Sequence, residues 1–264
     1  MNLKPFLVRV YWILTCQIGI DPRVFIHSLR TLPSYVRDWK VFRKQYSGEM
    51  VFMPCLQDRH EESGVTKSEY FWQDLLVARL IHKANPKKHV DIGSRVDGFV
   101  AHIASFRECD VFDIRPITSV IPGITFHQAD LMKLESLPVG KDGYCDSLSC
   151  LHAIEHFGLG RYGDPISTKG YLLGISHMSK LLHLGGILYL ATPIGRERVE
   201  FNANWVFDPR TILKAAESSG LSLKKLITIT PVNGPQEVAI NPISLQDLSL
   251  SSYKLGLFIF EKIM

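Results

Sequence analysis

Three protonatable side chains, His152, Glu155 and His156, stand within five residues of one another. They follow a β-rich segment, residues 144–150, that we expect to form a strand of an open α/β sheet. Loops at the carboxyl ends of such strands line the ligand crevice. A histidine close to a carboxylate can take the proton of a weakly acidic hydroxyl near neutral pH. The spacing therefore predicts general-base chemistry, with His152 or His156 as the base and Glu155 orienting its imidazole.

The segment that follows, residues 157–165, is rich in glycine and polar residues, so that its backbone can come close to a substrate. We expect Arg161, Tyr162 and Asp164 to contact the acceptor. Asn202 and Asn204 lie beyond the next predicted strand, residues 187–191, and could hydrogen-bond other groups of the same acceptor.

A glycine turn earlier in the chain predicts the second half of the site. A short apolar strand, residues 90–92, leads into Gly93, and Gly98 lies inside the next predicted helix. Asp113 stands near the end of a second predicted strand, residues 109–114, where it could accept hydrogen bonds from two ribose hydroxyls. Glycine turn, helix, strand and terminal acid together predict a nucleoside-binding βαβ unit, although a turn of this kind also occurs in α/β proteins that bind no nucleoside.

The residues of this turn do not suit a dinucleotide. Dinucleotide sites use G-x-G-x-x-G, and here Ser94 and Arg95 follow Gly93 where a second glycine would admit the pyrophosphate. Asp91 would repel a phosphate and suits a ligand with an ammonium group. These features disfavour an NAD-dependent sugar dehydrogenase.

Residues 91–98 resemble the D-x-G-x-x-x-G signature of class I S-adenosylmethionine-dependent methyltransferases, whose cofactor carries an amino-acid tail and a sulfonium but no phosphate. In these enzymes an acid after the third strand contacts the adenine amino group, and Asp130, which ends predicted strand 124–130, matches that position. The resemblance implies S-adenosyl-L-methionine as cofactor, with contacts at Asp91, Gly93, Ser94, Arg95, Gly98, Asp113, Ile114, Arg115, Asp130, Leu131 and Cys150.

Further segments resemble a bacterial family of uncharacterised, methyltransferase-like proteins associated with surface-polysaccharide gene clusters. They are residues 19–23, 70–74, 91–95, 97–99, 113–115, 155–165 and 199–203. The family carries a histidine where this chain has Asn204, so no catalytic role is expected there. The resemblance implies O-methylation of a sugar in a cell-surface glycan or its precursor, with Arg161 and Tyr162 holding the sugar.

The remaining pattern predicts a class I methyltransferase fold, an α/β Rossmann-like sheet of mostly parallel strands with a terminal antiparallel pair. Helices are expected at residues 70–84 and 171–184, with another from 208 to 220. Residues 221–230 and 254–262 read as strands with no helix between them, which implies that they are antiparallel. At 264 residues and 46% hydrophobic content, we expect a helical extension and connector over 1–65 and the cofactor-binding domain over 66–264.

The excess of basic over acidic residues lies in the N-terminal arm. Through Lys44 there are eight basic and two acidic residues, which leaves 22 basic and 24 acidic residues for the rest of the chain. The near-neutral remainder argues against a nucleic-acid surface. The apolar residues 6–20 are too short for a membrane span and lack a signal-peptide cleavage site. With the basic, aromatic segment 23–46, they predict either peripheral contact of residues 1–46 with a membrane, a helical layer on the catalytic domain, or a dimer contact.

Five scattered cysteines form no C-x-x-C pair, so neither a disulfide framework nor a zinc site is predicted, and a reducing, cytoplasmic location fits best. Two alternatives remain open. His152, Glu155 and His156 resemble the metal-binding Glu-x-x-Glu-His of small-RNA terminal 2′-O-methyltransferases, although we expect no metal here. The chain could also be a non-catalytic scaffold recruited to a membrane, which would have no need of the acids Asp91, Asp113 and Asp130.

Overall fold

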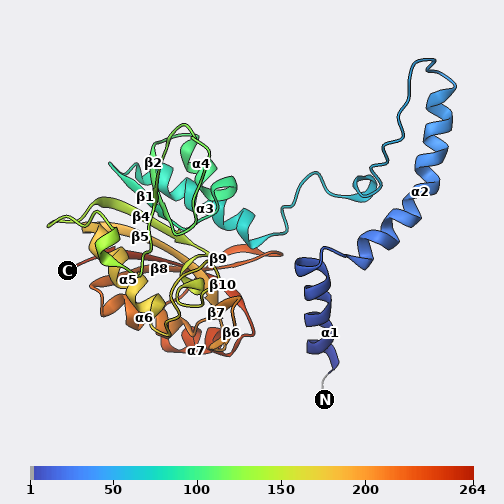
Figure 1. Cartoon of the computed structure of the whole chain (residues 1–264). Coiled ribbons are helices and arrows are strands. Elements are labelled where there is room, and N and C mark those ends of the chain that lie inside the picture. The colour runs from blue at the N-terminus through green and yellow to red at the C-terminus, as the bar shows by residue number, and fades with distance from the viewer. Residues whose placement is uncertain (1–2) are drawn as a thin grey trace. The chain divides into compact units, whose positions relative to one another are not determined.

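The computed structural model describes residues 3–264, and its internal contacts divide the chain into two compact units, Met1–Val65 and Thr66–Met264 (Figure 1). Each unit is described by itself. The first contains α1 (Leu3–Trp12), a π-helical turn (Ile13–Gln17) and α2 (Pro22–Arg43). Asp21 begins α2 by accepting a hydrogen bond from the Arg23 amide, and Pro22 takes the first helical position, where its missing N–H costs nothing. Among the described residues, no helix is both long and apolar enough to cross a bilayer.

The second unit is built on one eight-stranded sheet with the strand order β3-β2-β1-β4-β5-β10-β8-β9. Its strands are β1 (His89–Ile92), β2 (Cys109–Asp113), β3 (Ile124–Gln128), β4 (Cys145–Leu151), β5 (Leu182–Ile194), β8 (Leu221–Thr230), β9 (Gly234–Val238) and β10 (Lys254–Lys262). Strands β1 to β5 pair in parallel, whereas β10 is antiparallel to both β5 and β8. The predicted fold class, a mostly parallel α/β sheet with terminal antiparallel strands, is confirmed.

Helices cover both faces of this sheet (Figure 1). They are α3 (Glu69–Ala84), α4 (Ala101–Ala104), α5 (Gly170–Leu181), α6 (Pro209–Glu217) and α7 (Pro242–Leu250). One apolar cluster joins α3 and α4 to the sheet, and a second joins α5, α6 and α7 to it. Successive side chains of a strand point to opposite faces, so β10 gives Leu257 to the first cluster and Phe258 to the second. Two buried faces explain the continuous apolar runs in β5 (187–191) and β10 (257–260).

Two predictions about the second half of the chain are wrong. A helix, α7, and a strand, β9, lie between β8 and β10, where no helix was expected. Asn241 caps α7 by accepting a hydrogen bond from the Ser244 amide and Pro242 follows it, the same start signal as Asp208 and Pro209 at α6. The antiparallel pairing is nevertheless present, because β10 inserts between β5 and β8.

The glycine pair at 185 and 186 does not end a helix. Helix α5 already ends at Leu181, and β5 begins at the next residue. Gly185 has a φ of 78° inside the strand, close to the point where the β4–β5 register shifts between Cys145 and Ser147. The glycines therefore mark an irregularity at the start of β5, which a residue without a Cβ accommodates.

Candidate functional site

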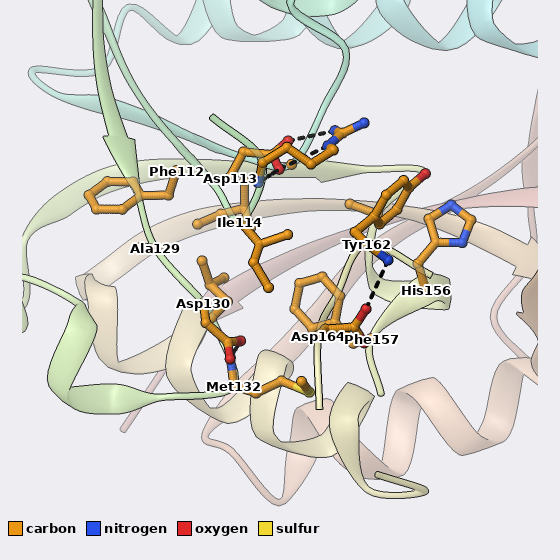
Figure 2. Close-up of a pocket in the computed structure, with 15 residues that line it drawn as sticks. Phe112, Asp113, Ile114, Ala129, Asp130, Met132, His156, Phe157, Tyr162 and Asp164 are labelled. Carbon is orange, nitrogen blue, oxygen red and sulfur yellow. Dashed lines mark hydrogen bonds and ion pairs between the residues drawn. The ribbon is translucent and has the colours of Figure 1, made fainter. Parts of the chain in front are cut away.

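Two adjoining cavities open at the carboxyl ends of β1, β2 and β4, where an open α/β sheet binds its ligands. The first has a largely apolar wall (Figure 2). The second is larger and more polar, and α3 forms one of its walls. Residues that line both cavities show that the two are connected. They are Gly93, Asp113, Arg115, His156 and Tyr162.

The turn after β1 requires a glycine at position 93. Gly93 has a φ of 68°, and a Cβ added to it would lie 2.9 Å from the Ala153 Cβ. Gly98 lies in a kinked π-helical segment (Val96–Val100) rather than in a regular helix, with φ −122° and ψ −109°. A Cβ at Gly98 would lie 3.0 Å from the Asp74 carboxylate. Gly93 lines both cavities, whereas Gly98 lines neither and leaves room for the Asp74 carboxylate.

We expect Gly93→Ala to lower affinity for an adenosyl ligand at least tenfold, because the new methyl group must push the turn or Ala153 into the cavity. Gly163→Ala is the matched control, since Gly163 has a φ of 83° but nothing within 4 Å of its added Cβ. Both variants should lose about 1–3 kcal/mol of stability from left-handed backbone strain. Calorimetric titration with S-adenosylhomocysteine and thermal unfolding measure the two effects. Equal affinities of the two variants would contradict this account of the turn.

Asp91 organises the turn from below. Its carboxylate is fully buried and accepts hydrogen bonds from the Ser94 hydroxyl (2.7 Å), the Ser94 amide (3.1 Å) and the Ser149 hydroxyl (2.6 Å). Burial raises the pKa of Asp91 to about 7. Asp91 lines neither cavity, so a direct contact with an ammonium group would require Ser94 or Ser149 to move.

Asp113 ends β2 as predicted and lines both cavities, but Arg115 occupies most of its carboxylate. Oδ1 accepts hydrogen bonds from the Arg115 amide (2.8 Å) and Nε (3.0 Å), and Oδ2 accepts one from Nη2 (2.5 Å). A carboxylate offers about four acceptor positions. One position on Oδ2 therefore remains for a ribose hydroxyl, and a second hydroxyl would have to displace Arg115.

Asp130 lies just beyond β3, at the far end of the apolar cavity (Figure 2). Its Oδ1 accepts a hydrogen bond from the Met132 amide (2.9 Å), whereas the buried Oδ2 receives none and lies 3.7 Å from Lys133 Nζ. Ile114 and Phe157 contribute apolar side chains to the same wall. A buried acceptor at the edge of an apolar pocket fits a flat ring that carries an amino group.

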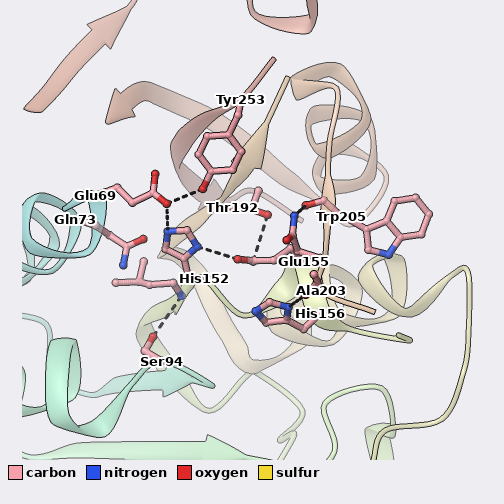
Figure 3. A network of polar contacts seen from close by, with 12 residues as sticks. Glu69, Gln73, Ser94, His152, Glu155, His156, Thr192, Ala203, Trp205 and Tyr253 are labelled. Atoms are coloured by element: carbon pink, nitrogen blue, oxygen red, sulfur yellow. Dashed lines mark hydrogen bonds and ion pairs between the residues drawn. The ribbon is translucent and has the colours of Figure 1, made fainter. Parts of the chain in front are cut away.

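The predicted trio lies where β4 ends, and Glu69, Tyr70 and Tyr253 surround its first histidine (Figure 3). His152 has a φ of 52°, and its Nδ1 lies 2.9 Å from Glu155 Oε1. On the other side of the ring, Nε2 lies 3.6 Å from Oε1 of Glu69, which also accepts a hydrogen bond from the Tyr253 hydroxyl (2.6 Å). The ring of Tyr70 covers the imidazole, with 4.4 Å between the ring centroids.

These contacts favour the imidazolium form of His152. Burial lowers the pKa of His152, but the hydrogen bond to Glu155 and the surrounding carboxylates outweigh burial and raise the pKa above its ordinary value. Burial raises the pKa of Glu155, and the hydrogen bond and charge of His152 outweigh it and lower the pKa. Because these contacts favour its protonated form, His152 is the poorer candidate for a general base.

His156 has the opposite electrostatics. Burial and the positive charge of Arg161 lower its pKa, so the ring is neutral at pH 7. Its Nδ1 lies 2.7 Å from the Ala203 carbonyl oxygen, which can only accept, so Nδ1 carries the hydrogen and Nε2 keeps its lone pair. His156 lines both cavities. Of the two predicted bases, His156 has the protonation state that the chemistry needs.

The loop after His156 is organised by Asp164. Its Oδ2 accepts hydrogen bonds from the amides of Gly158 (2.9 Å) and Gly160 (3.1 Å), and its Oδ1 accepts one from the Tyr162 amide (3.2 Å). The Asp164 carboxylate therefore holds the loop in shape, and few of its hydrogen-bonding positions remain for an acceptor substrate. Arg161 donates to the Ala203 carbonyl oxygen (2.9 Å).

The other predicted site residues divide between the cavities and the core. Ser94, Arg95, Arg161 and Asn204 line the polar cavity, and Leu131 lines the apolar one. Asn202 lines neither cavity. Cys150 has no exposed surface and belongs to the second apolar cluster, so the contact expected of it has no counterpart in either cavity.

Sequence reasoning missed the contribution of α3. Helical periodicity in residues 70–84 would place Phe71 and Leu75 on the apolar face, but both are exposed, whereas Gln73 and Asp74 are buried and line the polar cavity. Asp74 accepts a hydrogen bond from Gln73 (3.0 Å), and burial raises its pKa. Two polar residues on the buried face of a helix are a signal that helical periodicity could have revealed. Glu69 and Tyr253, 184 residues apart, carry no such signal.

Within the described part of the chain, no three His, Cys, Asp or Glu side chains converge in a way that could hold a metal ion. Glu155 directs one oxygen at His152, and its other oxygen lies 3.4 Å from the Thr192 hydroxyl. His152 and Glu155 are therefore directed at each other and at the protein, whereas His156 lines both cavities.

Comparison with known proteins adds a partial family match and a fold. A family model described as a Caenorhabditis protein of unknown function, DUF268, matches residues 136–213, which contain the trio and its loop. A comparison with curated proteins gives no match. Among solved structures, the [4+2]-cyclase SpnF aligns with a TM-score of 0.51 at 12% identity, over 72% of this chain and 82% of the cyclase.

A second solved structure is the 1,6-didemethyltoxoflavin-N1-methyltransferase of Burkholderia thailandensis, which contains 1,6-didemethyltoxoflavin and S-adenosylhomocysteine. It aligns with a TM-score of 0.51 at 10% identity, over 93% of this chain and 92% of the enzyme. The chain has the class I methyltransferase fold. Since the same fold serves a cyclase and a methyltransferase, the chemistry of this chain has to be argued from its own site.

Proposed function

We propose that this chain is an S-adenosylmethionine-dependent methyltransferase that methylates a hydroxyl of a sugar in a cell-surface glycan or its precursor. The observation that carries the proposal is the pairing of two connected cavities. One is apolar and ends in a buried, unsatisfied carboxylate oxygen, and the other contains a neutral histidine whose Nε2 is free of hydrogen. A nucleoside fits the first cavity, and an acceptor hydroxyl fits the second.

The residues present suit S-adenosylmethionine. Its adenine would lie between Ile114 and Phe157, with its amino group donating to Asp130 Oδ2, and a ribose hydroxyl would donate to Asp113. The turn at Gly93 would admit the rest of the cofactor. Bound there, S-adenosylmethionine supplies a methyl group activated by its sulfonium.

Asp74 is our candidate for the ammonium group of the cofactor. It lines the polar cavity and lies close to the glycine turn, whereas Asp91 is buried beneath it. The other acids near the turn already have cationic partners, since Arg95 pairs with Asp97 and Arg115 with Asp113. A cationic ligand would relieve the cost of burying the Asp74 carboxylate.

His156 is our candidate for the general base. Nε2 would take the proton of the acceptor hydroxyl as the oxygen attacks, and the Ala203 carbonyl would stabilise the resulting imidazolium through Nδ1–H. Arg161 and Tyr162 stand beside the ring and would hold the acceptor sugar, together with Asn204. His152 would position this loop as a fixed cation rather than accept a proton.

The assignment of Asp130 to the adenine amino group has its own test. Asp130→Asn is expected to weaken S-adenosylhomocysteine binding about tenfold, since one hydrogen bond to a charged acceptor contributes about 1.5–3 kcal/mol. Wild-type protein should prefer S-adenosylhomocysteine over S-inosylhomocysteine, which has an oxygen in place of the amino group, and the variant should lose that preference. Calorimetric titration measures both affinities. Asp142→Asn, at an exposed carboxylate outside both cavities, is the control.

The proposal as a whole is tested by incubating the purified chain with methyl-labelled cofactor and cell-envelope fractions. We expect label to enter the glycan or glycan-precursor fraction as a base-stable methyl ether. Label in RNA, with activity lost on chelation, would favour the metal-assisted alternative. Cofactor binding without transfer to any fraction would favour a scaffold.

A further inference from the structure

Helix α2 has two apolar faces, and the first unit covers only one of them. On the covered face, the rings of Tyr35 and Trp39 contact Phe52 of the following connector, with centroid distances of 5.2 and 5.9 Å. Thr31, on the same face, is buried. These contacts cover that face of the helix within the first unit.

A second face, about 100° around the helix from the first, carries an exposed apolar stripe, which consists of Phe25, Leu29 and Val36. Their exposed fractions are 64%, 55% and 39%. At 100° per residue these side chains fall within an arc of about 40°. Exposed apolar side chains aligned in this way indicate a surface that binds another protein or a membrane.

An arginine stripe, which consists of Arg23, Arg30 and Arg37, runs parallel to the apolar stripe. These residues are exposed and seven positions apart, so they too fall within about 40°, and the two stripes are about 120° apart around the helix. The arm through Lys44 has eight basic and two acidic residues. An apolar stripe flanked by arginines is the pattern of a helix that lies in the interface of an anionic bilayer.

We propose that α2 binds the surface of an anionic membrane, with the apolar stripe among the acyl chains and the arginine stripe at the lipid phosphates. The positive charge of the arm favours an anionic membrane over a second copy of the chain as its partner. A second copy of the arm would bring like charges together, whereas anionic lipids compensate them. Helix α2 is not apolar enough to cross the bilayer, so the contact is peripheral. The inference depends only on the first unit and stands apart from the proposed methylation.

The test is flotation of the full chain with vesicles of phosphatidylcholine alone or with about a third phosphatidylserine, a composition that gives a negative surface potential. We expect binding only to the anionic vesicles and release at high salt, because the Debye length shrinks to about 3 Å at 1 M. Replacing Arg23, Arg30 and Arg37 with glutamine should weaken binding about a hundredfold, since each arginine near the surface contributes about fivefold. Phe25→Ser with Leu29→Ser and Val36→Ser should also abolish binding.

Matched controls come from the second unit. Replacing the exposed Lys141, Lys169 and Lys214 with glutamine makes the same change in net charge, and replacing the exposed Val120, Val232 and Ile243 with serine likewise removes three exposed apolar side chains. Both controls should bind like the wild type. Absence of wild-type binding, equal loss in variants and controls, or a serine variant that changes only the oligomeric state in sedimentation equilibrium would overturn the proposal. Circular dichroism shows whether each variant keeps its helix content.

Discussion

Replacing His156 with glutamine is expected to lower the rate of methyl transfer by about 10²–10⁴, the usual contribution of a general base. Glutamine can still donate a hydrogen bond to the Ala203 carbonyl oxygen but cannot accept a proton at neutral pH. Affinity for S-adenosylhomocysteine should change less than threefold, since the ring is only one of many cofactor-site residues. Because His156 has a lowered pKa, wild-type activity should fall only as the pH drops below 6.5. Initial rates and calorimetry on the same preparations separate the two effects.

His183→Gln is the matched control for this variant. His183 is half-buried, lines neither cavity and also directs its Nδ1 at a backbone carbonyl, that of Asp142 at 2.6 Å. The His183→Gln variant should therefore have the wild-type rate of methyl transfer. If His156→Gln keeps wild-type turnover, His156 is not the general base. If only His152→Gln loses turnover, His152 is the general base instead.

Replacing Glu155 with glutamine should destabilise the protein by about 3–5 kcal/mol near pH 6, because it leaves the buried His152 cation without its main partner. The pKa of His152 is raised above 6.5, so its contribution to stability is complete below pH 6.5 and is lost as the pH rises through the folded-state value. The pKa of Glu155 is lowered below 4.5, so its contribution is present above pH 4.5 and is lost as the pH falls.

The difference between wild type and Glu155→Gln should therefore be largest between pH 4.5 and 6.5 and should shrink on either side. Urea unfolding at several pH values measures it. Glu237→Gln is the control, because Glu237 pairs with Lys225 at 2.8 Å on the exposed surface, where a salt bridge contributes at most about 1 kcal/mol. A pH-independent difference would mean that His152 is not held as a cation.

Features of the site that depend on neighbouring residues in the chain could be predicted from the sequence. A glycine with positive φ after a strand and acids at or just past strand ends are set by neighbours in the chain, and Gly93, Asp113 and Asp130 lie at the crevice. The terminal strands are antiparallel as predicted, although α7 lies between them where no helix was expected, and its start signal is Asn241 before Pro242.

What could not be predicted depends on contacts between distant segments. Asp91 meets Ser149 from a strand 58 residues away, and this contact turns a candidate cofactor ligand into a buried support for the turn. Glu69 reaches His152 only because α3 begins beside the carboxyl end of β4. The choice between His152 and His156 likewise depends on the Ala203 carbonyl, 47 residues beyond His156. Spacing along the chain identifies the trio but not the protonation state of its members.

The most direct test of the central claim is a crystal structure of the chain with S-adenosylhomocysteine. We expect the adenine between Ile114 and Phe157, with its amino group on Asp130 and the amino-acid tail running past Gly93 toward Asp74. An adenosyl group bound elsewhere, or a crevice that takes up a pyrophosphate ligand instead, would contradict the account.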